Sequence, residues 1–233
     1  MPVVVLNNRD HNQLRVRPPI NFDYLSNAHM LPLVFPECGH AANEFPVVFT
    51  RKEGTDQLQL VAIFSLSPGQ NLFVRDGKWE GLYLPGIIQN VPFKITNDPQ
   101  EPSNMILGLD TDSEFVSESE GEALFDETGN ETEFLQAMKS SMRNYYEQDQ
   151  MTQAATKYLT ELDLLTESDL TVVVGDKKVR VDGVYTTDIV RLKELPTEKF
   201  IELRDKDLLP LLYAQIFSIN QFHRLARYEA ATG

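Results

Sequence analysis

The sequence has a single cysteine, Cys38, among 233 residues, so no disulfide can form within the chain. Disulfides persist mainly in oxidising compartments, and this count therefore favours a reducing one. The N-terminal residues include no basic segment before the apolar run Val3 to Leu6, which is too short for the core of a signal peptide. Together these absences predict a cytoplasmic location.

Long hydrophobic runs are missing as well. The longest apolar tract, Leu208 to Phe222, is interrupted by Gln215, Ser218 and Asn220. It is shorter than the roughly 20 apolar residues that a membrane-spanning helix needs. We interpret this tract as a buried helix and expect no membrane insertion.

Basic residues are scarce, and the net charge is -14. Between Ile95 and Met138 there is no Lys or Arg at all. No basic cluster is available to neutralise phosphates, which excludes nucleic acid as an expected partner, and an anionic membrane surface would repel the chain. The same stretch holds the acids Asp98, Glu101, Asp110, Asp112, Glu114, Glu118, Glu120, Glu122, Asp126, Glu127, Glu131 and Glu133.

What is present fits a globular protein, with 42% hydrophobic and 24% charged residues. Short apolar runs separated by Gly-containing turns predict a β-rich N-terminal half of antiparallel hairpins. Val47 to Thr50 is expected to pair with Leu58 to Leu66. Leu72 to Val74 is expected to pair with Trp79 to Leu84 through an Asp-Gly turn, and the residues 91–95 and 105–109 are further strand candidates.

Helical periodicity begins near Asn130, which we predict as a helix N-cap. The C-terminal half is expected to be helical, with one further hairpin. The fold class is therefore α+β, and we predict one domain over residues 1–233, or alternatively two subdomains, 1–115 and 123–233, separated by the acidic loop 110–122. The expected helices are 134–145, 151–162, 188–195 with Thr187 as cap, 198–204 and one beginning near Leu208, and the expected hairpin joins 170–174 to 179–181.

The densest cluster of reactive side chains is Glu37, Cys38 and His40, with Glu44 on the same face if the segment is helical. A thiol, an imidazole and two carboxylates are ligands that zinc accepts. No second ligand pair accompanies them, so we predict no metal site and retain these residues only as weak candidates. Cys38 and His40 lie two positions apart and would point away from each other, which is a poor geometry for a nucleophile and its base.

The acidic segment beginning at Asp110, Asp112 and Glu114 resembles the start of a calcium loop, but Phe115 and Gly121 occupy positions where an EF-hand needs Gly and Glu. The motifs of serine hydrolases, P-loops, dinucleotide-binding folds and zinc proteases are all missing from the sequence. The sequence therefore identifies no reaction and no cofactor.

Aromatic residues gather around the second predicted hairpin. Phe73, Trp79, Tyr83 and Phe93 could line a ligand-binding or partner-binding surface, with Asn71 and Gln89 as polar anchors. The alternative is that these rings form an ordinary sheet core. We keep Asn71, Phe73, Trp79, Tyr83 and Phe93 as candidate binding residues.

Several blocks together resemble the bacterial SapC family, from about residue 10 to residue 225. The most specific block contains the motif Gly-x-Asn-Leu-Phe-Val, followed by Gly-x-Trp and then by two short segments that each contain a proline. The residues that carry the resemblance are Pro36-Glu37, Ala41-Ala42, Phe45 to Phe49, Pro68 to Val74, Gly77 to Trp79, Tyr83 to Pro85, Pro92-Phe93, Glu122 to Asp126 and Leu208 to Ala214.

The resemblance implies a link to a bacterial surface-layer system, after which the family is named, but no catalytic residues. Three functions stay open. The leading one is a cytoplasmic binding or accessory protein acting with a surface-layer, export or modification system. The second is an enzyme with a site near Glu37, Cys38, His40 and Asp110. The third is an exported surface-layer component.

Overall fold

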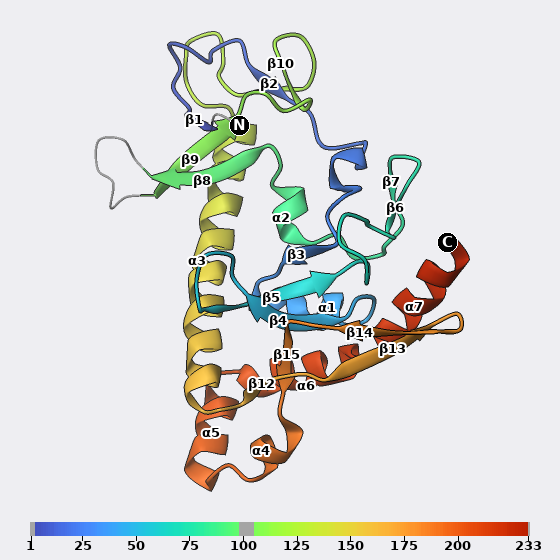
Figure 1. Cartoon of the computed structure of the whole chain (residues 1–233). Helices are drawn as coiled ribbons and strands as arrows, with labels where there is room; N and C mark the ends of the chain where they lie inside the picture. Colours follow the sequence, from blue (N-terminus) through green and yellow to red (C-terminus); the bar gives the residue numbers. More distant parts are fainter. Residues whose placement is uncertain (1–2, 98–104, 233) are drawn as a thin grey trace. The chain divides into compact units, whose positions relative to one another are not determined.

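The computed structural model describes residues 3–97 and 105–232, which fold into two compact units (Figure 1). The first unit comprises residues 1–20 and 86–147, and the second comprises residues 21–85 and 148–233. Strands predominate in the N-terminal half and helices in the C-terminal half, so the predicted α+β class is confirmed. That residues 1–233 act as one domain stays a prediction.

The first unit is built on two small antiparallel sheets. Its core contains Phe93, Leu109, Leu124 and Leu135, which are buried together. One sheet has the order β1-β9-β8 and the other the order β10-β2-β11. The elements of this unit are β1 (Val3–Val5), β2 (Arg15–Val16), α2 (Gly86–Gln89), β8 (Phe93–Asn97), β9 (Met105–Asp110), β10 (Val116–Ser117) and β11 (Glu122–Ala123).

The second unit is built around a five-stranded antiparallel sheet in the order β12-β15-β4-β5-β3. Five apolar residues at the centre of β4 and β5 are almost fully buried, which explains why these strands form the middle of the sheet: Val47, Val48, Phe49, Leu60 and Val61. The strands of this unit are β3 (Met30–Pro32), β4 (Val47–Arg51), β5 (Leu58–Ile63), β6 (Val74–Arg75), β7 (Lys78–Trp79), β12 (Leu165–Glu167), β13 (Leu170–Val174), β14 (Lys177–Val181) and β15 (Val184–Thr187).

Two of the predicted hairpins are confirmed, β4 with β5 and β13 with β14. The second predicted hairpin is shorter than expected, because only β6 and β7 pair around the Asp76-Gly77 turn. Asp76 and Gly77 both have positive φ, as a tight hairpin turn requires. Beyond Trp79 the chain leaves the ladder, so the strand predicted to return through Leu84 was wrong.

The predicted pair of helices after Asn130 is one continuous helix, α3 (Glu133–Glu161). Residues 146–150 contain no Gly or Pro that would end a helix, so the two predicted segments are continuous. The predicted cap was also wrong. Helix α3 begins at Glu133, and the Thr132 hydroxyl accepts the Leu135 amide at 3.3 Å.

Among the other helices, those near the C-terminus follow the predicted ranges, with two corrections. Asp188, and not Thr187, caps its helix by accepting the Arg191 amide at 2.9 Å. The apolar tract from Leu208 is two helices, since the first ends at Ser218 and the next begins at Gln221. These elements are η1 (Asp23–Leu25), η2 (Phe35–Glu37), α1 (Cys38–Ala41), α4 (Ile189–Lys193), α5 (Thr197–Asp205), α6 (Leu208–Ser218) and α7 (Gln221–Thr232).

None of the helices in the described ranges 3–97 and 105–232 is both long and apolar enough to cross a membrane.

Candidate functional site

The candidate anchor Asn71 is buried and already engaged by the backbone around it. Its side-chain amide donates to the Leu25 carbonyl at 3.2 Å, and its side-chain oxygen accepts the Phe73 amide at 2.9 Å. These two hydrogen bonds tie the segment before β6 to η1. Asn71 therefore shapes the turn and does not present its polar group at the surface.

The predicted aromatic group does gather in the second unit, around a ring that the sequence analysis did not single out. Phe45 lies 4.7 Å from Phe73 and 5.1 Å from Phe64 between ring centroids, both in edge-on geometry. The Trp79 ring is 5.4 Å from that of Phe64 and 6.0 Å from that of Phe73. Because Phe45, Phe64 and Phe73 are buried, they form core, and Trp79 covers them from the half-buried edge.

Tyr83 and the two carboxylates of the predicted reactive cluster come together beside these rings. The Tyr83 hydroxyl donates to Glu37 Oε1 at 2.6 Å, and Glu37 Oε2 accepts the Val34 amide at 3.0 Å. Both oxygens of Glu44 accept the Leu82 amide, at 2.8 and 2.9 Å, and one also accepts the Tyr83 amide at 3.2 Å. The carboxylates are thus occupied in fixing the turn between β7 and α2.

That turn has an unusual surface. Leu82 is 98% exposed, although its own amide is held by the buried Glu44 carboxylate. The Trp79 indole N–H donates to the Tyr83 carbonyl at 2.9 Å and closes the base of the turn. The exposed His40 ring stacks on the Tyr83 ring, with centroids 5.7 Å apart and planes inclined by 15°. We call residues 80–85 the Leu82 turn.

Cys38 lies under this cluster, within the core of the second unit. Its thiol donates to the Leu211 carbonyl at 3.9 Å. Burial raises the pKa of the thiol to about 12, because the charged thiolate would lose its hydration. A group that stays protonated near neutral pH is a poor nucleophile and a poor metal ligand.

We therefore expect Cys38 to resist alkylation in the folded protein. A pKa of about 12, compared with 9.0 for an ordinary thiol, leaves roughly a thousandfold less thiolate at pH 8. Iodoacetamide labelling followed by mass spectrometry should be slow in native buffer and complete within minutes in guanidinium chloride. Equal labelling rates in the two conditions would contradict the buried placement.

The other residues proposed from the sequence lie in the first unit. Phe93 is packed in that unit's core, 6.2 Å from Phe134 between ring centroids. Asp110 is buried at the end of β9 and accepts Lys94 Nζ at 2.9 Å. Within the first unit, Phe93 thus packs in the core and Asp110 pairs with Lys94.

The acidic loop 110–122 is partly tied down by arginines of β2 and its neighbour. Arg15 donates to the Gly121 carbonyl at 3.1 Å, and Arg17 donates to the Glu114 carbonyl at 3.0 Å. Within the ranges 3–97 and 105–232, no three His, Cys, Asp or Glu side chains are grouped closely enough to hold a metal ion. The acids Asp98 and Glu101 of the predicted acidic stretch lie outside the described residues.

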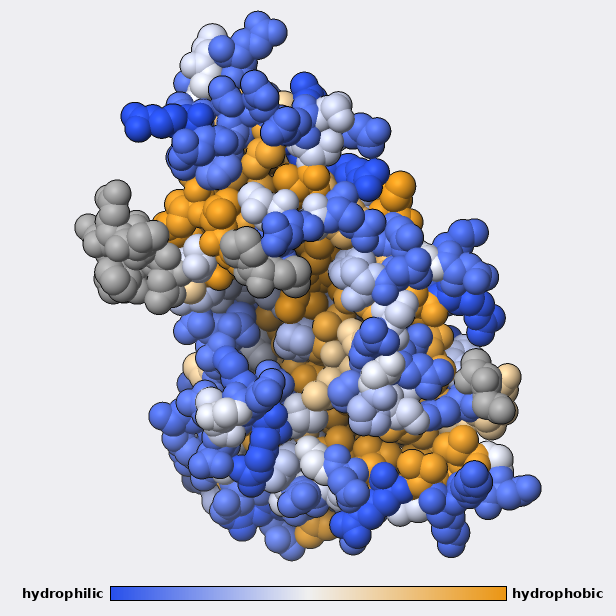
Figure 2. Space-filling model, turned by 45° about the horizontal axis from the view of Figure 1, so that its top comes forward, coloured by the Kyte–Doolittle hydropathy of each residue, from blue (hydrophilic) through white to orange (hydrophobic). Residues whose placement is uncertain are grey.

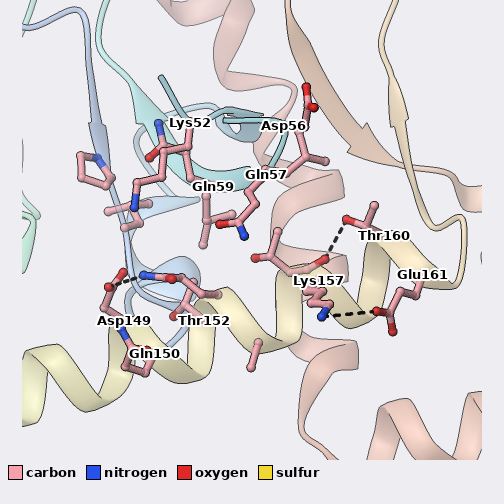
Figure 3. Close-up of a pocket in the computed structure, with 17 residues that line it drawn as sticks. Lys52, Asp56, Gln57, Gln59, Asp149, Gln150, Thr152, Lys157, Thr160 and Glu161 are labelled. Atoms are coloured by element: carbon pink, nitrogen blue, oxygen red, sulfur yellow. Dashed lines mark hydrogen bonds and ion pairs between the residues drawn. The ribbon is translucent and has the colours of Figure 1, made fainter. Parts of the chain in front are cut away.

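A groove of about 510 Å³ in the second unit was not anticipated from the sequence (Figure 3). One wall is the C-terminal half of α3, and the other is β5 with the turn that precedes it. No motif marks these residues, because they are separated by about 90 positions and meet only in the fold. The groove is lined by Pro32, Leu33, Lys52, Asp56 to Leu60, Asp149, Gln150, Thr152 to Ala154, Thr156, Lys157, Thr160 and Glu161.

These features define an acidic α+β protein whose clustered ionisable side chains fix its own backbone, and whose surface carries an exposed leucine turn and a polar groove. A family model described as SapC matches residues 6–225, and the chain belongs to the SapC family. The resemblance in the sequence is thereby confirmed. No curated protein and no solved structure gives a significant match to the chain.

Proposed function

We propose that this SapC-family chain is a binding or accessory protein that inserts the Leu82 turn into an apolar pocket of a protein partner. The observation that carries the proposal is the combination of a fully exposed leucine with a buried carboxylate that fixes its backbone. A convex apolar side chain on a rigid base is suited to fill a partner's pocket, as anchor residues of interfaces do. It is not suited to enclose a small molecule, which needs a concave site.

The catalytic alternative near Glu37, Cys38, His40 and Asp110 has less support. Glu37 and Glu44 accept hydrogen bonds from the protein itself, and the Cys38 thiol is buried with a raised pKa. Asp110 belongs to the other unit. A nucleophile needs a base within hydrogen-bonding reach, and this cluster offers Cys38 none.

Exposed hydrophobic residues are common on protein surfaces and do not by themselves mark an interface. Hydrophilic residues predominate on the face drawn in Figure 2, with hydrophobic residues exposed between them. Other large hydrophobic side chains, such as Val190 and Phe217, are also exposed. The Leu82 turn differs because the Leu82 and Tyr83 amides both donate to Glu44, which fixes the backbone that carries the exposed side chain.

The proposal includes a location inside the cell, where the chain would act with a surface-layer, export or modification system. Cys38 is the chain's single cysteine and is buried, so the fold uses no disulfide within the chain, as is usual for proteins of a reducing compartment. Fractionation of the native cells decides between this placement and the exported alternative. Recovery with the external layer would contradict the cytoplasmic role.

The partner proposal is tested by capturing proteins from a lysate of the native cells on the full-length chain. Leu82→Asp places a charge in the proposed contact and should reduce the amount of captured partner at least about tenfold, since burying an unpaired charge is costly. Val190→Asp is the matched control, because Val190 is 65% exposed on α4 and lies outside the turn. It should leave capture unchanged.

Trp79→Ala tests the base of the turn in the same assay and should also reduce capture. Because this substitution removes part of the aromatic core, its melting temperature must be measured alongside. A purified partner that binds the parent chain and the Leu82→Asp variant with equal affinity by calorimetry would overturn the proposal.

A further inference from the structure

The groove between β5 and α3 runs along a strand edge and not across a sheet face. Gln57, Leu58, Gln59 and Leu60 all line it. Side chains at successive strand positions point to opposite faces. A hollow that touches four consecutive residues must therefore follow the backbone edge of the strand.

Part of this edge is left without a neighbouring strand. On this side β5 is covered by β3, whose pairing ends with Pro32 opposite Val61. The Leu33 amide then donates to the Leu60 carbonyl at 3.0 Å, and the chain turns into η2. Among the described residues, no strand pairs with Leu58 from that side.

The direction of the Leu58 backbone groups follows from the ladder. In an antiparallel strand, the N–H and C=O of one residue point to the same edge, and alternate residues point to opposite edges. The Leu60 carbonyl faces Leu33, whereas the Gln57 carbonyl accepts the Lys52 amide on the opposite edge. The N–H and C=O of Leu58 therefore point into the groove.

The opposite wall adds a second polar feature. Thr156 on α3 lines the groove and is only 2% exposed, and its hydroxyl has no hydrogen-bond partner in the described structure. Its neighbours along the helix differ, since the Thr152 hydroxyl accepts the Phe35 amide and the Thr160 hydroxyl donates to the Thr156 carbonyl. The protein itself encloses this hydroxyl, so it is not presented directly to an occupant of the groove.

The remaining lining narrows the chemical class of that occupant. Four glutamines line the groove beside two lysines and three acids, and Figure 3 shows Gln57 and Gln59 on the strand side facing the α3 side chains across the groove. No aromatic ring lines it for a sugar to stack on, and of its two lysines Lys157 lies 4.0 Å from Glu161. This lining suits neither a carbohydrate nor a phosphate. Leu33 and Leu60 add apolar surface to the groove.

We propose that this groove binds an extended polypeptide segment, which adds to β5 as a strand by pairing with Leu58. Main-chain hydrogen bonds to the strand edge supply the affinity in this mode of recognition, and side-chain pockets supply the selectivity. The Gln side-chain amides can bond to a peptide's outward-facing backbone groups. The groove residues are not those of the Leu82 turn, so this proposal does not rest on the partner proposed there.

The first test uses a phage-displayed library of random heptapeptides, panned against the folded full-length chain. Selected peptides are then synthesised and their affinities are measured by fluorescence polarisation. Ala154→Trp fills the groove from α3 and should weaken binding at least about tenfold, whereas Ala137→Trp is a matched exposed site on the same helix outside the groove and should not.

The second test distinguishes strand addition from other ways of binding a peptide. N-methylation of alternate amides of the selected peptide should abolish binding in one register and leave it nearly unchanged in the other, since only alternate amides face β5. Equal effects in both registers would overturn the proposal. So would a library that yields no peptide sensitive to Ala154→Trp, or a concentration-dependent dimer of the chain that Ala154→Trp abolishes, because a second copy would then occupy the edge.

Discussion

Replacing Phe45 with alanine is expected to lower the free energy of unfolding of the second unit by about 3–5 kcal/mol. The Phe45 side chain is fully buried, and its ring meets those of Phe64 and Phe73 edge-on. Truncation removes the burial of the ring together with these aromatic pairs. The close-packed strands around it can fill the resulting cavity only in part.

The chain's single tryptophan makes this measurement direct. Trp79 lies 6.0 Å from Phe45 between ring centroids, so its fluorescence during urea unfolding reports on this core. Phe217→Ala is the matched control, because Phe217 is 67% exposed on α6 and its truncation should change stability by less than about 0.5 kcal/mol. Similar losses for the two variants would show that the ring cluster is not a core.

Glu44→Ala is expected to destabilise the second unit by about 3 kcal/mol. The Glu44 side chain is almost fully buried and accepts the amides of Leu82 and Tyr83. Alanine leaves both amides without their acceptor, and hydrogen bonds to a charged group are among the stronger ones. The Leu82 turn should loosen first, because Glu44 is what holds its backbone.

Two readouts check this result. Urea unfolding gives the change in stability, and hydrogen exchange by NMR should show faster exchange of the Leu82 and Tyr83 amides. Glu44→Gln retains one carbonyl oxygen and should lose about half as much stability. Glu53→Ala, an exposed glutamate in the turn between β4 and β5, is the control. If Glu44→Ala destabilised the protein no more than this control does, the role given to Glu44 would be contradicted.

Elements whose conformation depends on neighbouring residues in the sequence could be predicted, whereas elements fixed by distant residues could not. The β4–β5 and β13–β14 hairpins have alternating apolar residues and a glycine turn, and both formed as expected. The sequence predicts two helices where the structure has the single helix α3. The helix is continuous because no Gly or Pro between the two predicted segments ends it. The strand expected after Trp79 failed because Glu44, far away in sequence, binds the turn instead.

The candidate site shows the same limit. The chemistry of Glu37, Glu44 and Tyr83 is visible in the sequence, but the sequence does not reveal that both carboxylates bind Tyr83, because these contacts cross about 40 positions. The groove beside β5 had no signal, since threonines and glutamines at helical spacing look like an ordinary solvated face. The edge of a strand is recognisable only when its neighbours are known.

The sequence by itself determined the family, the α+β class, the acidic charge and the absence of a catalytic motif, since each follows from residue order and composition. The tertiary structure decided which polar groups have hydrogen-bond partners within the described part of the protein and which do not. Carboxylates that look reactive in the sequence accept hydrogen bonds from backbone amides. In contrast, among the described residues no strand pairs with Leu58 on the groove side, and the Thr156 hydroxyl has no hydrogen-bond partner. The physical reason is that hydrogen-bond satisfaction depends on distances between segments, and these distances exist only in the folded chain.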